Sequence, residues 1–348
     1  MEPIMIRNKA LNSLPERPDD LAKDSERALH IPDGFLDTKT VAATSILSAV
    51  GLGIAFQHLK KENQPRQIPL MGLAGAFVFT AQMLNFPIAG GTSGHLIGGV
   101  LASVLLGPSA AVVVITSVLF VQCFLFADGG ILALGANVFN MAIIAPLCGY
   151  GIYAKIRRVV PGMRGVIIAV AFASWCSAVL ASICCAGELA LSGTVRWETA
   201  FFAMTSVHAL IGLGEGLITA MVIAAVSATR PELLELHSHP LNARDLRAFI
   251  VYGLIVTVGL ILFVAPFASS LPDGLEKVSV RLGFGNKAVR QSLVSVPFTD
   301  YKFPGIPSVT IATVAAGVLG MLFVFVLSVI LAYVLFPKTQ GNQSKVMK

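Results

Sequence analysis

Charged side chains are scarce in this chain of 348 residues. Only 13% of the residues are Asp, Glu, Lys or Arg, whereas 55% are hydrophobic, and the mean hydropathy is +0.79. A soluble core does not need so much apolar chain, and repeated apolar runs of about 20 residues match helices that cross a hydrocarbon layer about 30 Å thick. The composition therefore predicts an all-α polytopic membrane protein.

Several chemical motifs are absent as well. The sequence has no G-x-x-x-x-G-K-[ST] phosphate loop, so it cannot hydrolyse ATP through that motif. The five cysteines show no C-x-x-C spacing and lie in apolar runs, which is typical of small buried hydrophobic residues. The net charge of +6 forms no basic stripe interleaved with aromatics, so nucleic acid is not an expected partner.

The first 28 residues lack a sustained apolar run and carry five basic and six acidic residues. A secretory signal needs an apolar central region. We therefore interpret residues 1–28 as a disordered N-terminal extension.

Nine apolar segments follow this extension. The third is too short to span a bilayer without tilt, and we expect it to be partly re-entrant. The segments cover 38–58, 68–86, 94–107, 108–126, 130–154, 164–188, 198–228, 248–268 and 308–336.

Positive charge orients these segments, because Lys and Arg gather in short cytoplasmic loops. Four clusters agree with a single topology, with the N-terminus outside and the C-terminus cytoplasmic in the cell (inner) membrane. The same alternation places residues 29–36 and 85–95 together on the outer face. The clusters are Lys60, Lys61 and Arg66; Lys155, Arg157 and Arg158; Arg230, Arg244 and Arg247; and the Lys-rich carboxyl tail.

Two histidines, His30 and His95, lie in these outer segments. If the chain began at Leu29, its free amine, the amide nitrogen of His30 and the His30 imidazole could close two chelate rings around one cation, and His95 would supply a fourth nitrogen. Four nitrogens in a plane suit Ni²⁺ or Cu²⁺, and less commonly low-spin Co²⁺. Mg²⁺ and Ca²⁺ prefer oxygen ligands. An isolated histidine near a membrane interface is more often a hydrogen-bonded loop residue. The prediction of a metal site therefore rests on His30 and His95 together.

Small residues surround both histidines. Gly94 and Gly98 have the G-x-x-x-G spacing that permits close helix approach. Pro32-Asp33-Gly34 favours a tight reversal, and we interpret Asp33 as turn chemistry before metal ligation.

Other polar residues could support the histidines or gate access to them. His208 and Glu215 are seven residues apart, hence on one helix face, and ionisable groups in the bilayer tend to be functional. The alternative for His208 is a hydrogen bond to a neighbouring helix. Asn85, His208, Glu215 and Asp33 are therefore candidates for indirect or gating roles. Gln122, Asp128, Asn137 and Asn140 could orient the histidines or join one helix to the next.

Four separated motifs resemble the substrate-binding M component (CbiM/NikM type) of cobalt and nickel energy-coupling-factor transporters. They are HIPDGFL, NFPIAGGTSGHLIGG, FADGGILALGANVFNM and HALIGLGEGLIT. The stretch 271–305, with LPDGLE and DYKFPG, resembles the small N component. The resemblance implies a seven-helix M-like domain over 29–228, a cytoplasmic linker over 229–247, and an N-like PDGLE domain over 248–340 with two membrane helices and an outer loop.

In that family the M component takes Ni²⁺ or Co²⁺ from outside, and a transmembrane coupling (T) protein and two ATP-binding-cassette ATPases drive transport. The resemblance thus implies a transport subunit rather than an enzyme, with no permanent cofactor. The transported substrate would be Ni²⁺ or Co²⁺, and the fused arrangement favours nickel.

The chain departs from the family pattern at residue 29. The family motif usually begins at the initiator methionine, whose amine is a ligand, whereas here Leu29 follows 28 other residues. Three explanations are open: a start assigned too far upstream, which we favour, cleavage after Ala28, or a different fourth ligand.

Two other functions fit the sequence less well. An intramembrane metalloenzyme should carry a base beside its metal, as in H-E-x-x-H, and no such motif occurs. An autonomous channel or secondary transporter should show an ion-coupling site or an inverted repeat, and neither is detected. Neighbouring genes for ATPases and a coupling protein would favour the transporter subunit.

Overall fold

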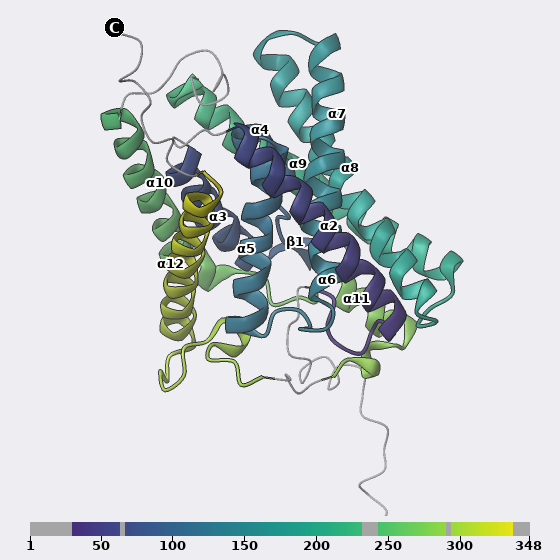
Figure 1. Ribbon diagram of the computed structural model, residues 1–348. Coiled ribbons are helices and arrows are strands. Elements are labelled where there is room, and N and C mark those ends of the chain that lie inside the picture. The colour runs from purple at the N-terminus through teal and green to yellow at the C-terminus, as the bar shows by residue number, and fades with distance from the viewer. Residues whose placement is uncertain (1–29, 63–66, 232–242, 290–293, 337–348) are drawn as a thin grey trace, which may run out of the picture.

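The computed structural model describes residues 30–62, 67–231, 243–289 and 294–336. Leu29, the extension 1–28 and most of the linker predicted over 229–247 lie outside these residues. Within them, seven helices are long and apolar enough to cross a membrane, which confirms the all-α polytopic fold (Figure 1).

The amino-terminal region consists of helices that run back and forth across the molecule. Most boundaries fall within a few residues of the predicted ones, and α3 is a shorter apolar helix of 16 residues. The helices are α2 (Thr38–Glu62), α3 (Ile68–Met83), α4 (Gly99–Leu106), α5 (Pro108–Phe126), α6 (Leu134–Asn137), α7 (Ala145–Val159), α8 (Gly162–Leu191) and α9 (Trp197–Thr229).

One of these spans contains a π-helix, η2 (Val138–Ile144), which joins α6 to α7. It ends just before Ala145-Pro146, and proline has no backbone N–H to continue a regular ladder. Single π-helical turns occur often at functional sites, and η2 carries Asn140.

The predicted third segment is the least regular. The chain first forms a β-hairpin of β1 (Phe86–Ile88) and β2 (Thr92–Gly94), in which Phe86 pairs with Gly94. Gly90 and Gly91 form its turn with positive φ angles of 84° and 70°, which glycine adopts without steric cost. The helix that follows, α4, has only eight residues, too few to span a bilayer, as predicted. The G-x-x-x-G prediction was wrong, because Gly94 ends a strand and Gly98 lies in the left-handed region before α4.

The carboxyl-terminal region, residues 243–336, adds two long helices and a structured loop. These are α10 (Ala243–Phe263), η4 (Ala265–Phe267), α11 (Gly274–Leu282), η5 (Gly285–Lys287), η6 (Thr299–Tyr301) and α12 (Val309–Leu335). The α12 helix packs closely on α3, where small residues let the backbones approach: a Cβ atom on Gly75 would lie 2.7 Å from Ser328 Oγ. Phe79, Phe126, Tyr301 and Val324 share one core, so both regions bury a common surface.

Figure 1 shows which loops lie together. The start of α2, the short helix α6 and α11 lie at the lower end, whereas the α7–α8 connection and the described end of α12 lie at the upper end. The hairpin strand β1 lies in the interior between them. The lower half therefore gathers the loops that carry the candidate site.

Candidate metal centre

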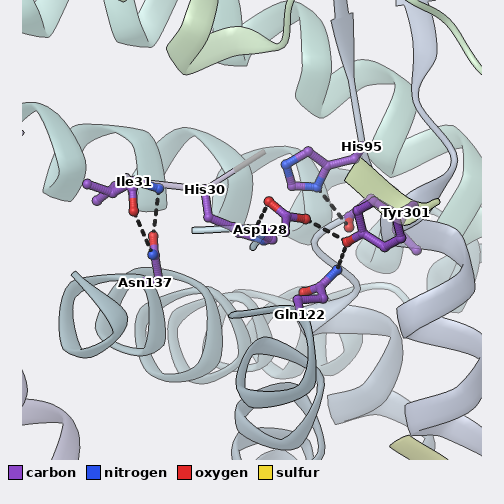
Figure 2. A network of polar contacts seen from close by, with 8 residues as sticks. His30, Ile31, His95, Gln122, Asp128, Asn137 and Tyr301 are labelled. Carbon is purple, nitrogen blue, oxygen red and sulfur yellow. Dashed lines mark hydrogen bonds and ion pairs between the residues drawn. The ribbon is translucent and has the colours of Figure 1, made fainter. Parts of the chain in front are cut away.

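The two histidines of the predicted site, His30 and His95, lie close together in the structure. His30 precedes α2 and His95 follows β2, and their ring centroids are 5.5 Å apart with an angle of 59° between the ring planes. Figure 2 shows both rings beside Asp128. The sequence-based prediction that two distant segments converge is therefore confirmed.

His30 is held by Asp128. Its Nδ1 atom lies 2.9 Å from Asp128 Oδ1, and both side chains are 1% exposed. Burial would raise the pKa of Asp128, but the charge of His30 and hydrogen bonds from His30 and Tyr301 hold that pKa below its ordinary value. An ionised carboxylate only accepts hydrogen bonds, so Nδ1 is the donor in this contact. Among the described residues, the buried Nε2 atom of the same ring has no hydrogen-bond partner.

Asp128 is held in turn by Tyr301 from η6. The Tyr301 hydroxyl donates to Asp128 Oδ2 at 2.6 Å, and Gln122 Nε2 donates to the same hydroxyl oxygen at 3.0 Å (Figure 2). Burial and the neighbouring carboxylate raise the pKa of Tyr301 well above its usual range, so the phenol keeps its proton. Asp128 and Gln122 were predicted either to orient the histidines or to join one helix to the next, and the structure places both in this network. Tyr301 was missed, although it lies within the DYKFPG motif.

The backbone beside His30 is fixed by Asn137. Its Oδ1 atom accepts from Ile31 N at 2.9 Å and its Nδ2 atom donates to Ile31 O at 3.1 Å. The Asp33 carboxylate accepts from three consecutive backbone N–H groups, at residues 131, 132 and 133, at 2.9–3.1 Å. The Asp33 carboxylate therefore ties the His30 segment to the start of α6 through contacts about 100 positions away in the sequence, rather than through the local turn chemistry that was predicted.

The His95 hairpin rests on the carboxyl-terminal loop. Ser93 N and Ser93 Oγ donate to Pro272 O and Leu271 O, at 2.8 and 2.7 Å. Beyond His95, Glu215 Oε1 accepts from Gly98 N at 3.1 Å and Gln82 Nε2 donates to Ile97 O at 2.9 Å. Glu215 thus supports the histidine segment through its backbone.

His208, the remaining predicted polar residue on α9, lines the same cavity as the two histidines. Its Nδ1 atom contacts Met204 O at 2.8 Å, within its own helix rather than on a neighbouring one. Asn140 also lines the cavity and donates to Glu188 at 2.8 Å. Asn85 does not line the cavity. Its backbone carbonyl accepts a hydrogen bond from Ser269 N instead.

The cavity has a volume of about 70 Å³, enough for a cation and a few water molecules. Its walls come from both regions of the chain. The polar and sulfur-containing residues that line it are His30, His95, Asn137, Asn140, Met141, Ser182, Cys185, Met204, His208 and Asp273.

Within the described residues, no three His, Cys, Asp or Glu side chains are grouped closely enough to hold a metal ion. The four-nitrogen set that includes Leu29 stays a prediction, because Leu29 lies outside the described residues. Chelation through the His30 amide would need Nδ1, the imidazole nitrogen nearer the backbone. In the structure Nδ1 contacts Asp128, so the ring would have to turn before that chelate could form.

Comparisons with known proteins show the family of this chain. Residues 30–233 match the family described as cobalt uptake substrate-specific transmembrane region, and residues 247–337 match the PDGLE domain. A protein of Archaeoglobus fulgidus named as a fused nickel transport protein is 36% identical, over 86% of this chain and 96% of its own length. A fused nickel transport protein of Rhodobacter capsulatus is 33% identical, over 66% of this chain and 71% of its own.

A solved structure, a truncated transition metal transporter, matches with a TM-score of 0.53 and 35% identity, over 57% of this chain and 99% of that one. The family match spans more than half of the present chain and contains both histidines. The chain belongs to the cobalt-uptake substrate-specific transmembrane family, fused to a PDGLE domain.

Proposed function

We propose that this protein is the substrate-binding membrane subunit of an ATP-driven energy-coupling-factor importer, which captures Ni²⁺ or Co²⁺ at a site on the outer face. The convergence of His30 and His95 carries this proposal. Two imidazoles lie 5.5 Å apart at one cavity, and the buried Nε2 atom of His30 has no partner among the described residues. A buried polar atom without a partner is costly, and a cation at Nε2 would remove that cost.

The chemistry of the donors favours borderline metals. Imidazole nitrogen suits Ni²⁺, Co²⁺, Cu²⁺ and Zn²⁺, whereas Mg²⁺ and Ca²⁺ prefer oxygen. Asp128 Oδ1 contacts Nδ1 of the His30 ring. A carboxylate bonded to one ring nitrogen in this way orients a metal-ligating histidine and raises its basicity. The names of the relatives point to nickel and cobalt among these metals.

Charge distribution supports an outer-face site. Lys60 and Lys61 end α2, and Arg157 and Arg158 end α7. These helix ends lie away from α6 and α11 (Figure 1). Because positive residues favour the cytoplasm, the histidine cavity would open toward the outside of the cell membrane.

Energy must then come from partners. The chain has no phosphate loop, so ATP hydrolysis is assigned to separate ATP-binding-cassette subunits, joined through a transmembrane coupling protein. The role of this chain would be capture and release of the cation, without a permanent cofactor.

The test is a titration of Ni²⁺ and Co²⁺ into the purified full-length protein in detergent. Wild type should bind one ion tightly, and His30→Ala and His95→Ala should each abolish tight binding while the protein remains in the membrane. His58→Ala, at an exposed position on α2, is the matched control and should bind as wild type does. Tight binding by either site variant would refute the assignment.

The mass of the intact protein, measured on the same sample, shows whether Leu29 can contribute an amine. A terminus at residue 29 with tight binding supports the four-nitrogen set. A terminus at Met1 with tight binding requires another ligand in place of that amine.

A further inference from the structure

One acidic residue lines the histidine cavity, and it comes from the carboxyl-terminal region. Asp273 is the only Asp or Glu among the described residues that form the cavity wall, and it is 4% exposed. Asp128 contacts Nδ1 of His30 but is not part of that wall. The described wall therefore holds one carboxyl group, at Asp273, besides its nitrogen and sulfur donors.

The backbone around Asp273 is fixed between two elements of the amino-terminal region. Pro272 O, the carbonyl just before Asp273, accepts from Ser93 N on β2 at 2.8 Å. On the other side, a Cβ atom on Gly274 would lie 2.9 Å from His208 Nε2 on α9. The peptide groups that flank Asp273 are thus packed between β2, which leads to the predicted ligand His95, and α9.

One oxygen of the Asp273 carboxyl group caps α11. Its Oδ1 atom accepts from Glu276 N at 2.7 Å, as the side chain of an N-cap residue does. A carboxylate has two oxygens with about four acceptor positions. The cap therefore leaves acceptor capacity for a further contact at the cavity.

The charges around Asp273 favour a cation. No Lys or Arg is among the described residues that line the cavity, and Lys277 on α11 contacts Gly91 O at 3.3 Å instead. Burial and the nearby carboxylates of Glu276 and Asp128 raise the pKa of Asp273 well above its usual range. A buried carboxylate is costly without an opposite charge, and a divalent cation in the cavity would supply that charge.

We propose that Asp273, supplied by the carboxyl-terminal region, balances the charge of the cation in this cavity from outside the set of nitrogen ligands. The inference rests on the proposed function, because it requires the cavity to hold Ni²⁺ or Co²⁺. It holds whichever ring nitrogen of His30 binds the cation and whether or not the chain begins at Leu29, since the carboxylate replaces no nitrogen. The PDGLE match (247–337) and the cobalt-uptake match (30–233) would then share one site.

The test uses Asp273→Asn, which removes the charge and keeps a good N-cap residue for α11. The control, Glu276→Gln, makes the same change of charge three residues away, on a side chain that does not line the cavity. Ni²⁺ affinity is measured by calorimetry on the full-length proteins. Loss of a group that supports a metal site without ligating the metal costs about 10–100-fold in affinity. We expect a loss in that range for Asp273→Asn and an affinity close to that of wild type for Glu276→Gln.

Two further measurements separate a lost charge from a lost structure. Thermal unfolding without metal should be the same for Asp273→Asn and wild type, because the cap on α11 remains. The absorption bands of bound Ni²⁺ report the geometry of its ligands. They should keep their positions in Asp273→Asn, because the nitrogen ligands are unchanged.

Tight binding by wild type with no loss in Asp273→Asn would overturn this inference alone. An equal loss in Glu276→Gln would contradict it too, because the effect would not belong to the cavity, and so would shifted Ni²⁺ bands, because Asp273 would then be a ligand or would orient one. A wild type that bound neither Ni²⁺ nor Co²⁺ would overturn the proposed function and this inference with it. If Asp273→Asn did not fold, Asp273→Ser, which also keeps an N-cap side chain, would replace it under the same expectations.

Discussion

At the scale of single residues, Asn137 shows how a buried amide holds the backbone of the segment that we propose to bind metal. It pairs with both the N–H and the C=O of Ile31, the residue next to His30. We expect Asn137→Ala to lower the free energy of unfolding by about 1–3 kcal/mol, because it leaves the buried N–H of Ile31 unpaired, whereas Ile31 O still accepts from Gly130 N. Denaturant titration in detergent measures this. Asn286→Ala, at an exposed position, serves as control, and equal stability of the two variants would contradict the expectation.

Part of this network could be predicted from the sequence. Gln122, Asp128 and Asn137 are polar residues at the ends of apolar runs, close in sequence to the FADGG turn, so a role near the histidines followed from position alone. Tyr301 could not be found in this way. It is 173 positions from Asp128, and only the tertiary fold, with its left-handed turn at Asp300 and Tyr301, brings the phenol to the carboxylate.

At the scale of secondary-structure elements, the glycine that begins α11 is a point of close packing. A Cβ atom on Gly274 would lie 2.8 Å from His208 Cε1 and 2.8 Å from Ile211 Cδ1 on α9. We expect Gly274→Ala to push α11 away from α9, to open the cavity and to weaken Ni²⁺ binding at least several-fold, measured by calorimetry.

The matched control is Gly259→Ala on α10, where nothing lies within 4 Å of the added Cβ. This variant should bind as wild type does and should be slightly more stable, because alanine favours a helix. Equal metal affinity of the two alanine variants would show that α11 tolerates displacement.

The long helices could be predicted from apolar length, because a bilayer fixes how many residues a span requires. The hairpin at 86–94 could not. Its residues are apolar or small and continue the preceding apolar run, whereas the contacts that support the hairpin reach Leu271 and Pro272, 178 and 179 positions away from Ser93. A local pattern contains no information about such partners.

At the scale of the whole molecule, the orientation in the membrane can be tested at the two ends of α8. Val159, just before this helix, and Leu191, its last residue, are exposed aliphatic positions. In a variant with its five native cysteines replaced by alanine, a membrane-impermeant maleimide should label Leu191→Cys in intact cells and Val159→Cys only after lysis. The reverse pattern would place the histidine cavity on the cytoplasmic side.

The contact between Asp128 and Tyr301 also has a consequence for the order of biosynthesis. The two residues are 173 positions apart, so at about 5–20 residues per second the ribosome needs roughly 10–35 s to supply the second after the first. Until then the nascent chain has its histidines but not the phenol that donates to Asp128, the carboxylate in contact with His30. The cavity also lacks its wall from residues 273–275 until the carboxyl-terminal region is made. Under the proposed function, tight metal capture should therefore begin only when translation is almost complete, which would protect the unfinished chain from trapping metal ions.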